Sequence, residues 1–357
     1  MGFVAFEHHR LIVAAADFLV AHQTERGDFR PPSSRAGYNE IYDAKGMFTV
    51  LQAAFMARRN PALLERYLAC VDRRLALFGR CQLPDGSLPL ACMGDRRFVF
   101  ATGVVAAVVK IFGELADERA HRAMAGRCVD YMVGVFTPES GFRDGTNASR
   151  LSGHDPYPLY ALHLWGEERA DAGALVGPAT AYVVDGQVWN AEGGFWKAGF
   201  EVSKGVNLQT VPHPTLDLDM MWVLFEMYGD RYADRMRSSI EGNRAYFEAI
   251  EAYYTENGNR YADVRARTSL AGIMALYDHH TGCREFTGSS QFQALVDWTV
   301  GLFDEQAGGF RERENLRTGE KAYFGVPAQY LGQYLFSCGV LNRNVPEAVL
   351  EHYAESE

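Results

Sequence analysis

The sequence predicts an all-α protein in which pairs of helices close into a ring, an (α/α)6 barrel. Three observations predict it: a glycine-bearing turn recurs along the chain, an amphipathic and then an almost wholly apolar helical run flank each turn, and strand patterns are weak. The chain has 357 residues, of which 48% are hydrophobic. It is therefore long and apolar enough to bury a large core. We expect one barrel domain over residues 1–357, with about twelve helices.

Glycine turns occur in the segments ERGDF, PDGSL, ESGF, EGGF, ENGNRY and QAGGF. With one glycine taken from each segment, the spacings are 59, 55, 53, 64 and 51 residues. Self-similarity at a nearly constant period is the signature of a repeat architecture. The turns contain Gly27, Gly86, Gly141, Gly194, Gly258 and Gly309. They predict six units of similar plan.

Each unit is expected to contain two helices of different character. The runs before the turns, such as 65–81 and 120–136, carry charged residues at exposed helical spacings. The runs after the turns are apolar on most faces, which is typical of a helix buried on all sides. We therefore assign an inner ring to residues 47–59, 100–113, 157–166, 220–229, 267–279 and 327–339. An open solenoid is the alternative, although its repeats are usually about 35 to 45 residues long. Residues 181–189 form the one plausible hairpin fragment.

Charge and composition exclude several classes of partner. The chain has 35 Lys and Arg against 45 Asp and Glu, a net charge of −10. This balance argues against nucleic acid or an anionic membrane as the main partner. No apolar run reaches the length of a membrane span, and the apolar stretch near the start is interrupted by Asp17 and lacks the features of a secretory signal. We expect no membrane span and a cytoplasmic location.

The cysteines are spread along the chain and form no CxxC pair. A disulfide framework is unusual in a chain of this length, and a structural zinc site needs more closely spaced ligands. We therefore expect reduced, buried thiols and no metal. The residues are Cys70, Cys81, Cys92, Cys128, Cys283 and Cys338.

Two units resemble a known repeat. The stretches PDGSL…FVFATGVVAAVVKIFG and EGGFWKAGF…LDLDMMWVLFEMYG are similar to the repeat of squalene cyclases and protein prenyltransferase β-subunits, in which a glycine turn and a loop lead into an inner helix of an α/α toroid. The stretch FDEQAGGFRERENLRTGEK is similar in style to sugar epimerases. Unsaturated glucuronyl hydrolases, acylglucosamine epimerases and the linalool dehydratase-isomerase use a similar barrel. Such a barrel carries many chemistries.

In such a barrel the N-terminal ends of the inner helices line the mouth of the cavity, so residues there are the candidates for function. Class II terpenoid cyclases carry a D-x-D-D motif at this place. In HPTLDLDMMW, Asp217 and Asp219 match its first two acids, and Met220 replaces the last. The resemblance implies that Asp219 donates a proton and that Asp217 is its partner. Burial would keep such an acid protonated. The alternative is that both acids cap the helix.

Further acids and a histidine fall at equivalent rim positions. Asp43 precedes a Met-Phe pair by the same spacing as Asp217 precedes a Met-Trp pair, which predicts the same rim position in a two-fold related unit. Asp43 could then form a carboxylate pair with Asp217 or Asp219, as acid–base catalysis on a sugar requires. The rigid segment SGHDPYPLY places His154 and Asp155 at another rim position. Capping and a structural histidine are the simpler explanations.

Arginines and aromatic residues complete the predicted rim. A cation at a helix N-terminus opposes the helix dipole, so it requires a reason. An anionic group of the substrate, such as a diphosphate or a sugar carboxylate, is one reason, and ion pairs with the rim acids are another. Aromatic rings could stabilise a carbocation or stack on a sugar, although such a group often belongs to the core. The candidate substrate-binding residues are Tyr38, Tyr42, Arg97, Phe98, Trp196, Trp222, Arg267 and Tyr323.

These residues favour an enzyme that acts on a small molecule. The sequence contains no D-D-x-x-D, G-x-x-x-x-G-K-[ST], G-x-S-x-G or H-E-x-x-H motif, so we expect neither cofactor nor metal. The first hypothesis is an acid-initiated cyclisation, isomerisation or (de)hydration of an isoprenoid or related alkene, with Asp219 as the acid, Asp217 and Asp43 as tuning partners and His154 as a base. The alternatives are a carbohydrate-active enzyme (a glycoside hydrolase, lyase or sugar epimerase) and a non-catalytic small-molecule binding protein. The sequence leaves the oligomeric state open.

Overall fold

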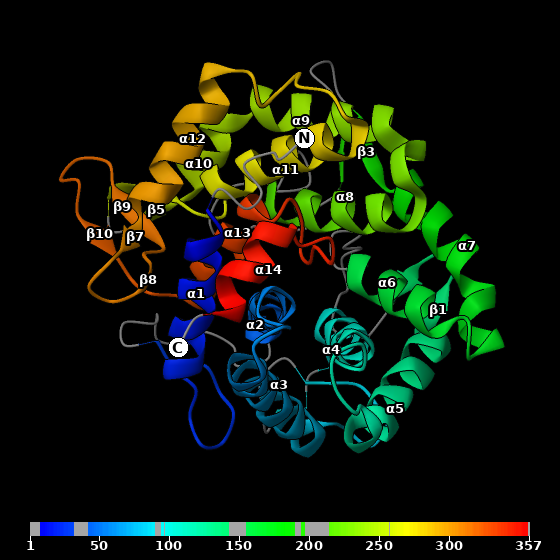
Figure 1. Cartoon of the computed structure of the whole chain (residues 1–357). Coiled ribbons are helices and arrows are strands. Elements are labelled where there is room, and N and C mark those ends of the chain that lie inside the picture. The colour runs from blue at the N-terminus through cyan, green and yellow to red at the C-terminus, as the bar shows by residue number, and fades with distance from the viewer. Residues whose placement is uncertain are drawn as a thin grey trace.

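The helices form a ring in which successive elements follow one another around a common axis (Figure 1). The computed structural model describes residues 8–31, 42–89, 94–95, 97–142, 155–189, 194–196, 214–256 and 258–355. In Figure 1 the chain passes from the blue α1 and α2 through the green α6 to α8 and returns to the red α13 and α14 beside its start. The fold is the predicted (α/α)6 barrel.

The inner ring consists of the apolar helices that the sequence predicts. Every residue of the first and last inner helices is buried, because neighbours surround these helices on all sides. Each inner helix contacts the next, and the last one contacts the first, so the ring is closed. In chain order the inner helices are α2 (Gly46–Met56), α4 (Val99–Phe112), α6 (Pro156–Trp165), α8 (Pro214–Tyr228), α11 (Arg267–Thr281) and α13 (Val326–Phe336).

The outer helices bury one face against the inner ring and keep the other in water. The longest of them begins where the Asn60 side chain accepts a hydrogen bond from the Leu63 N–H and Pro61 occupies the first turn. The outer helices are α1 (His9–Ala21), α3 (Pro61–Cys81), α5 (Arg119–Val135), α7 (Ala170–Asp185), α9 (Ala233–Ala245) and α12 (Ser290–Gly301). Two short helices, α10 (Phe247–Tyr253) and α14 (Glu347–Ala354), follow α9 and α13.

The repeated glycines are required by the turns that they occupy. Gly27, Gly86, Gly141 and Gly258 all have φ between 67° and 107°, a region that disfavours other residues. A Cβ on Gly86 would also lie 2.3 Å from the Arg127 carbonyl oxygen. The turn at Gly141 joins β1 (Phe136–Thr137) with β2 (Gly141–Phe142), and the turn at Gly258 joins β5 (Thr255–Glu256) with β6 (Asn259–Asp263). In the last unit Gly308, beside Gly309, has φ of 70° in the turn between β7 (Phe303–Asp304) and β8 (Gly309–Phe310).

The strands are more extensive than the sequence predicts. The expected hairpin fragment 181–189 is partly wrong, because residues 181–185 end α7 and the hairpin consists of β3 (Gln187–Trp189) and β4 (Gly194–Trp196). A four-stranded sheet, ordered β10-β9-β6-β5, joins the last two units. Its strands are β5 (Thr255–Glu256), β6 (Asn259–Asp263), β9 (Arg313–Asn315) and β10 (Lys321–Ala322). It lies just before the N-terminal ends of α11 and α13 in the chain.

One cysteine differs from expectation. Cys81, at the end of α3, is disulfide-bonded, so the prediction of six reduced thiols is wrong there. Cys70, Cys128, Cys283 and Cys338 are free thiols, and Cys92 lies outside the described residues.

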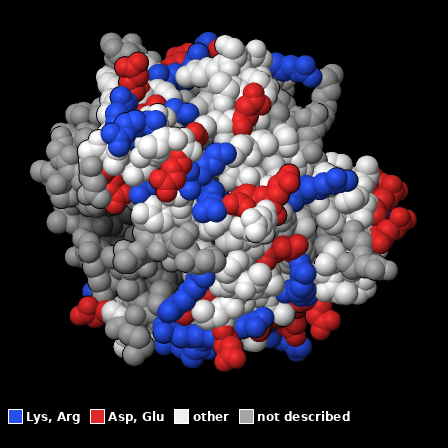
Figure 2. Space-filling model, turned by 90° about the vertical axis from the view of Figure 1, so that its left-hand side faces the viewer, with Lys and Arg blue, Asp and Glu red and all other residues white. Residues whose placement is uncertain are grey.

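No helix in the described ranges has the length and apolar character needed to cross a membrane. On the face shown in Figure 2, basic and acidic side chains of the described residues are interspersed.

Candidate functional site

A buried ion pair crosses the centre of the barrel. Lys45 ends a short 3-10 helix (Tyr42–Lys45) and immediately precedes α2, whereas Asp219 lies in the second turn of α8. The Lys45 ammonium donates hydrogen bonds to both Asp219 carboxylate oxygens, at 2.9 and 2.7 Å. The two side chains are 2% and 0% exposed. Because α2 and α8 are three places apart in a ring of six helices, the two charges meet from opposite sides.

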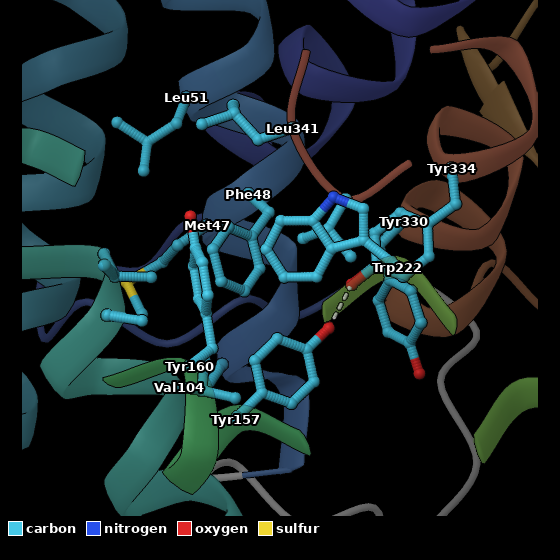
Figure 3. Close-up of a cluster of buried hydrophobic side chains, with 14 of the residues drawn as sticks. Met47, Phe48, Leu51, Val104, Tyr157, Tyr160, Trp222, Tyr330, Tyr334 and Leu341 are labelled. Atoms are coloured by element: carbon cyan, nitrogen blue, oxygen red, sulfur yellow. Dashed lines mark hydrogen bonds between the residues drawn. The ribbon is translucent and has the colours of Figure 1, made fainter. Parts of the chain in front are cut away.

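Two tyrosines extend the ion pair into a polar cluster. The Tyr157 hydroxyl, from the first turn of α6, donates to an Asp219 carboxylate oxygen at 3.0 Å. It also lies 3.1 Å from the Tyr334 hydroxyl of α13, and Figure 3 shows these tyrosines among the buried side chains. Three inner helices and the residue preceding a fourth therefore contribute to one hydrogen-bonded group.

Aromatic rings surround this cluster. The Lys45 ammonium lies 4.6 Å from the centre of the Tyr330 ring and 5.6 Å from that of Phe100, within the range of cation–π attraction. Phe48 and Trp222 follow Lys45 and Asp219 by three residues each, and their ring centres are 6.3 Å apart (Figure 3). The charged groups are therefore isolated from water by apolar surface.

Burial shifts the protonation of both charged groups towards neutrality. It raises the pKa of Asp219, and the nearby Lys45 ammonium opposes that shift. It lowers the pKa of Lys45, and Asp219 opposes that shift in turn. Burial also raises the pKa of Tyr157 well above its usual value. Such a pair suits proton transfer, because the buried carboxylate accepts a proton more readily, and the buried ammonium releases one more readily, than either group does in water.

Asp217 and Asp219 are not brought together. The helix α8 begins at Pro214, so both acids lie within it, and residues two apart on a helix point to different sides. An Asp217 carboxylate oxygen accepts hydrogen bonds from the Ser239 hydroxyl and the Asn243 amide, both at 2.6 Å. Because these partners belong to α9, Asp217 faces the outer ring, whereas Asp219 faces the axis.

Several candidate residues, or their side chains, lie outside the described part of the chain. Tyr38 and His154 lie outside the described residues. The same holds for the side chains of Tyr42 and Asp43, and for that of Trp196, whose backbone belongs to β4. Asp155 immediately precedes α6 and is buried, with 3% of its surface exposed. Their roles remain predictions.

The candidate arginines are engaged in ion pairs. Arg97 is exposed and pairs with Asp85 at 2.5 Å. Arg267, at the start of α11, pairs with Glu251 at 2.6 Å and lies over the Trp298 ring. Both cations are therefore neutralised by carboxylates of the protein, although neither Asp85 nor Glu251 is one of the rim acids that the sequence analysis named.

The remaining aromatic candidates occupy two different places. Trp222 belongs to the aromatic surroundings of the ion pair, and Phe98 is buried directly before α4. Tyr323 has φ of 59°, a strained value for a residue other than glycine. The Arg313 guanidinium lies 4.5 Å from the Tyr323 ring centre, beside the four-stranded sheet. Among the described residues, no three potential metal-ligating His, Cys, Asp or Glu side chains come together.

Lys45 is one of the site residues that the sequence analysis did not single out. The repeat contained the signal: aligning Asp43 with Asp217 places Lys45 at the position of Asp219. Opposite charges therefore occupy equivalent inward positions in the first and fourth units, and equivalent positions of opposite units face each other. The cyclase motif consists of acids, so the resemblance to it does not point to a lysine.

The fold is similar to that of several solved structures. No family model and no curated protein sequence matches this chain. A D-mannose isomerase matches with a TM-score of 0.62 and 9% identity over 95% of this chain and 98% of that chain. A cellobiose 2-epimerase from Bacillus thermoamylovorans matches at 0.60 and 11%, over 90% and 94% of the two chains. An α-1,6-mannanase from Salegentibacter sp. matches at 0.59 and 11%, over 92% and 98%. This likeness establishes the fold.

The resemblance to terpenoid cyclases and prenyltransferases is wrong, and the acid-initiated isoprenoid reaction is wrong with it. The matching structures are barrels named for sugar chemistry instead. Any (α/α)6 barrel requires a turn followed by an apolar inner helix, so this pattern does not distinguish terpenoid cyclases from carbohydrate-active enzymes. The geometry agrees, because the proposed proton donor Asp219 accepts both hydrogen bonds of the Lys45 ammonium as a carboxylate.

Proposed function

We propose that the protein is a carbohydrate-active enzyme of the isomerase or epimerase kind, which moves a proton on an open-chain sugar at the Lys45–Asp219 site. Two similar barrels are named as a mannose isomerase and a cellobiose 2-epimerase. The observation that carries the proposal is a carboxylate held against an ammonium and a tyrosine hydroxyl at the axis of the barrel, near the N-terminal ends of the inner helices.

These groups are suited to proton abstraction beside a carbonyl. The Asp219 carboxylate would take the proton from the carbon next to the sugar carbonyl, and the electron pair would move to the carbonyl oxygen. The Lys45 ammonium and the Tyr157 hydroxyl would transfer their hydrogen bonds from Asp219 to that oxygen and stabilise its charge. Return of the proton to carbon 1, together with transfer of the hydroxyl proton from oxygen 2 to oxygen 1, isomerises an aldose to a ketose. Return of the proton to the opposite face of carbon 2 epimerises the sugar. Neither outcome consumes another reactant.

The residues beside Asp219 favour proton transfer over glycoside hydrolysis. Hydrolysis ordinarily uses two carboxyl groups that flank the scissile bond, one of them as the acid. The described partners of Asp219 are instead a lysine and a tyrosine, and Asp217 is held by α9. The rings of Phe48, Phe100 and Trp222 pack around these groups and shield them from water, which strengthens the electrostatic interactions among them.

Solvent exchange tests the proposal directly. The protein is incubated in heavy water with mannose, fructose, glucose and cellobiose, and proton NMR follows deuterium at carbon 2 of the aldoses and at carbon 1 of fructose. Mass spectrometry follows hydrolysis of α-1,6-linked mannose oligomers. We expect deuterium at carbon 2 of at least one reducing sugar, and none with the Asp219→Asn variant. Oligomer hydrolysis without exchange would assign a glycosidase and refute the proposal, as would the absence of both reactions.

A further inference from the structure

A pocket opens where the inner helices α8 and α11 end, at the opposite end of the barrel from the Lys45–Asp219 ion pair. Its volume is about 210 Å³, and its lining includes Glu226 from the last turns of α8, His279 and His280 from the end of α11, and Leu341 and Arg343 from the segment after α13. Lys45 and Asp219 lie near the opposite ends of their helices. The pocket is therefore a separate feature.

The ion-pair network of which the pocket wall forms a part carries an excess of negative charge. The Arg343 guanidinium donates to both Glu114 carboxylate oxygens, at 2.8 and 2.7 Å, and to Glu226 at 2.9 Å. Glu226 and Arg343 line the pocket and their charges cancel, and Glu114, which is outside the lining, brings the net charge of the network to −1. The side chains of Arg343 and Glu226 are 28% and 29% exposed, so solvent and a ligand can reach them.

The helices add to this negative potential. The last turn of α8 and the end of α11 contribute to the lining, so the C-terminal ends of two inner helices, which carry partial negative charge, lie at the pocket. The histidines do not offset it. Burial lowers the pKa of His280 to about 4, and burial also lowers the pKa of His279, so both imidazoles are neutral at pH 7. His280 is held flat against Phe225, with ring centres 4.6 Å apart.

We propose that this pocket binds a small organic cation, a protonated primary amine. The ammonium group would lie against the Glu226 carboxylate, where a charge-assisted hydrogen bond is strongest, and its short apolar chain would lie against Leu341 and Trp222. The neutral imidazoles add hydrogen-bond acceptors. The proposal is independent of the sugar chemistry at Lys45 and Asp219.

A charge series tests the proposal with ligands of equal size. Binding of n-butylammonium, n-butanol and butyrate at pH 7 is measured by isothermal titration calorimetry and ligand-observed NMR. We expect butylammonium to bind about tenfold or more tighter than butanol, and butyrate not to bind. Glu226→Gln should remove this preference, whereas Glu65→Gln, an exposed acid on α3, should retain it.

Two controls locate the site and monitor the fold. Arg343 keeps Glu114 as a partner in Glu226→Gln, and thermal unfolding checks that this variant remains folded. The double variant Lys45→Met/Asp219→Leu should still bind butylammonium, which separates this pocket from the central ion pair. Equal binding of butylammonium and butanol, or an unchanged preference in Glu226→Gln, would overturn the proposal.

Discussion

Breaking the ion pair between Lys45 and Asp219 is predicted to destabilise the protein strongly. Both side chains are almost fully buried and meet at 2.7 Å. Removing one partner leaves the other charge without compensation in an apolar core, which costs about 3 to 5 kcal/mol of unfolding free energy. We expect this loss in Lys45→Met. Asp219→Asn should lose a similar amount, well above the 1 kcal/mol or so expected if Asp219 only capped a helix.

Replacing both charges at once is predicted to cost little. Lys45→Met and Asp219→Leu keep the approximate volumes, and such exchanges of a buried ion pair are often neutral or stabilising by about 1 to 4 kcal/mol. The Tyr157 hydroxyl loses its acceptor but still has Tyr334 within 3.1 Å. The coupling between the two substitutions should therefore be about 3 kcal/mol or more.

The pKa shifts also indicate that the two buried charges together do not stabilise the fold. The pKa of Asp219 is raised, so the native state binds more protons than the unfolded state, and stability falls as pH rises from about 3.8 to the folded pKa. The pKa of Lys45 is lowered, so stability rises as pH increases from the folded pKa to about 10.5. Around neutral pH both titrations oppose folding.

Urea unfolding of wild type, both single variants and the double variant, followed by circular dichroism, gives the four free energies. The reasoning is refuted if each single substitution lowers the unfolding free energy by less than about 1 kcal/mol and the two effects are additive. An isolated buried charge should destabilise the protein by more than that.

Further substitutions test the packing and the charge state of other buried groups. Gly103→Ala should lose about 2 kcal/mol, because its Cβ would lie 2.3 Å from the Pro158 nitrogen where α4 meets α6. The control Gly126→Ala, on α5 with nothing within 4 Å, should gain about 0.5 to 1 kcal/mol. A fall of both melting temperatures by the same amount would contradict this account of the contact. The wild-type protein should lose up to about 3 kcal/mol of unfolding free energy between pH 6.5 and pH 4, because His280 takes up a proton in the unfolded state but not in the folded state. The variant His280→Phe should lose less over the same range. Equal losses for both proteins in urea titrations would contradict this cause.

Much of the fold could be predicted from the sequence because the barrel imposes a local pattern. A turn that needs a left-handed residue selects glycine, as at Gly27 and Gly86, and a helix surrounded by others selects apolar residues on every face. The four-stranded sheet could not be predicted in this way. Its strands are two to five residues long, too short for an alternating pattern, and β6 pairs with β9 about fifty residues away.

The site could be predicted only in part. Asp219 was identifiable because an acid inside an apolar helix requires a reason, and the helical period already implied that Asp217 faces the other way. The partner of Asp219 could not be identified in this way, because the hydrogen bond from Lys45 joins residues that are 174 positions apart in the chain. Ring closure alone brings these residues together, and the internal repeat is the one feature of the sequence that encodes it.

The most direct test of the central claim is solvent exchange with the double variant Lys45→Met/Asp219→Leu. If the ion pair is a proton-transfer site, wild type incorporates deuterium at carbon 2 of its sugar substrate, and the double variant, with near wild-type stability, incorporates none. If the double variant exchanges deuterium as fast as wild type, the ion pair is a structural element and the chemistry lies elsewhere in the barrel.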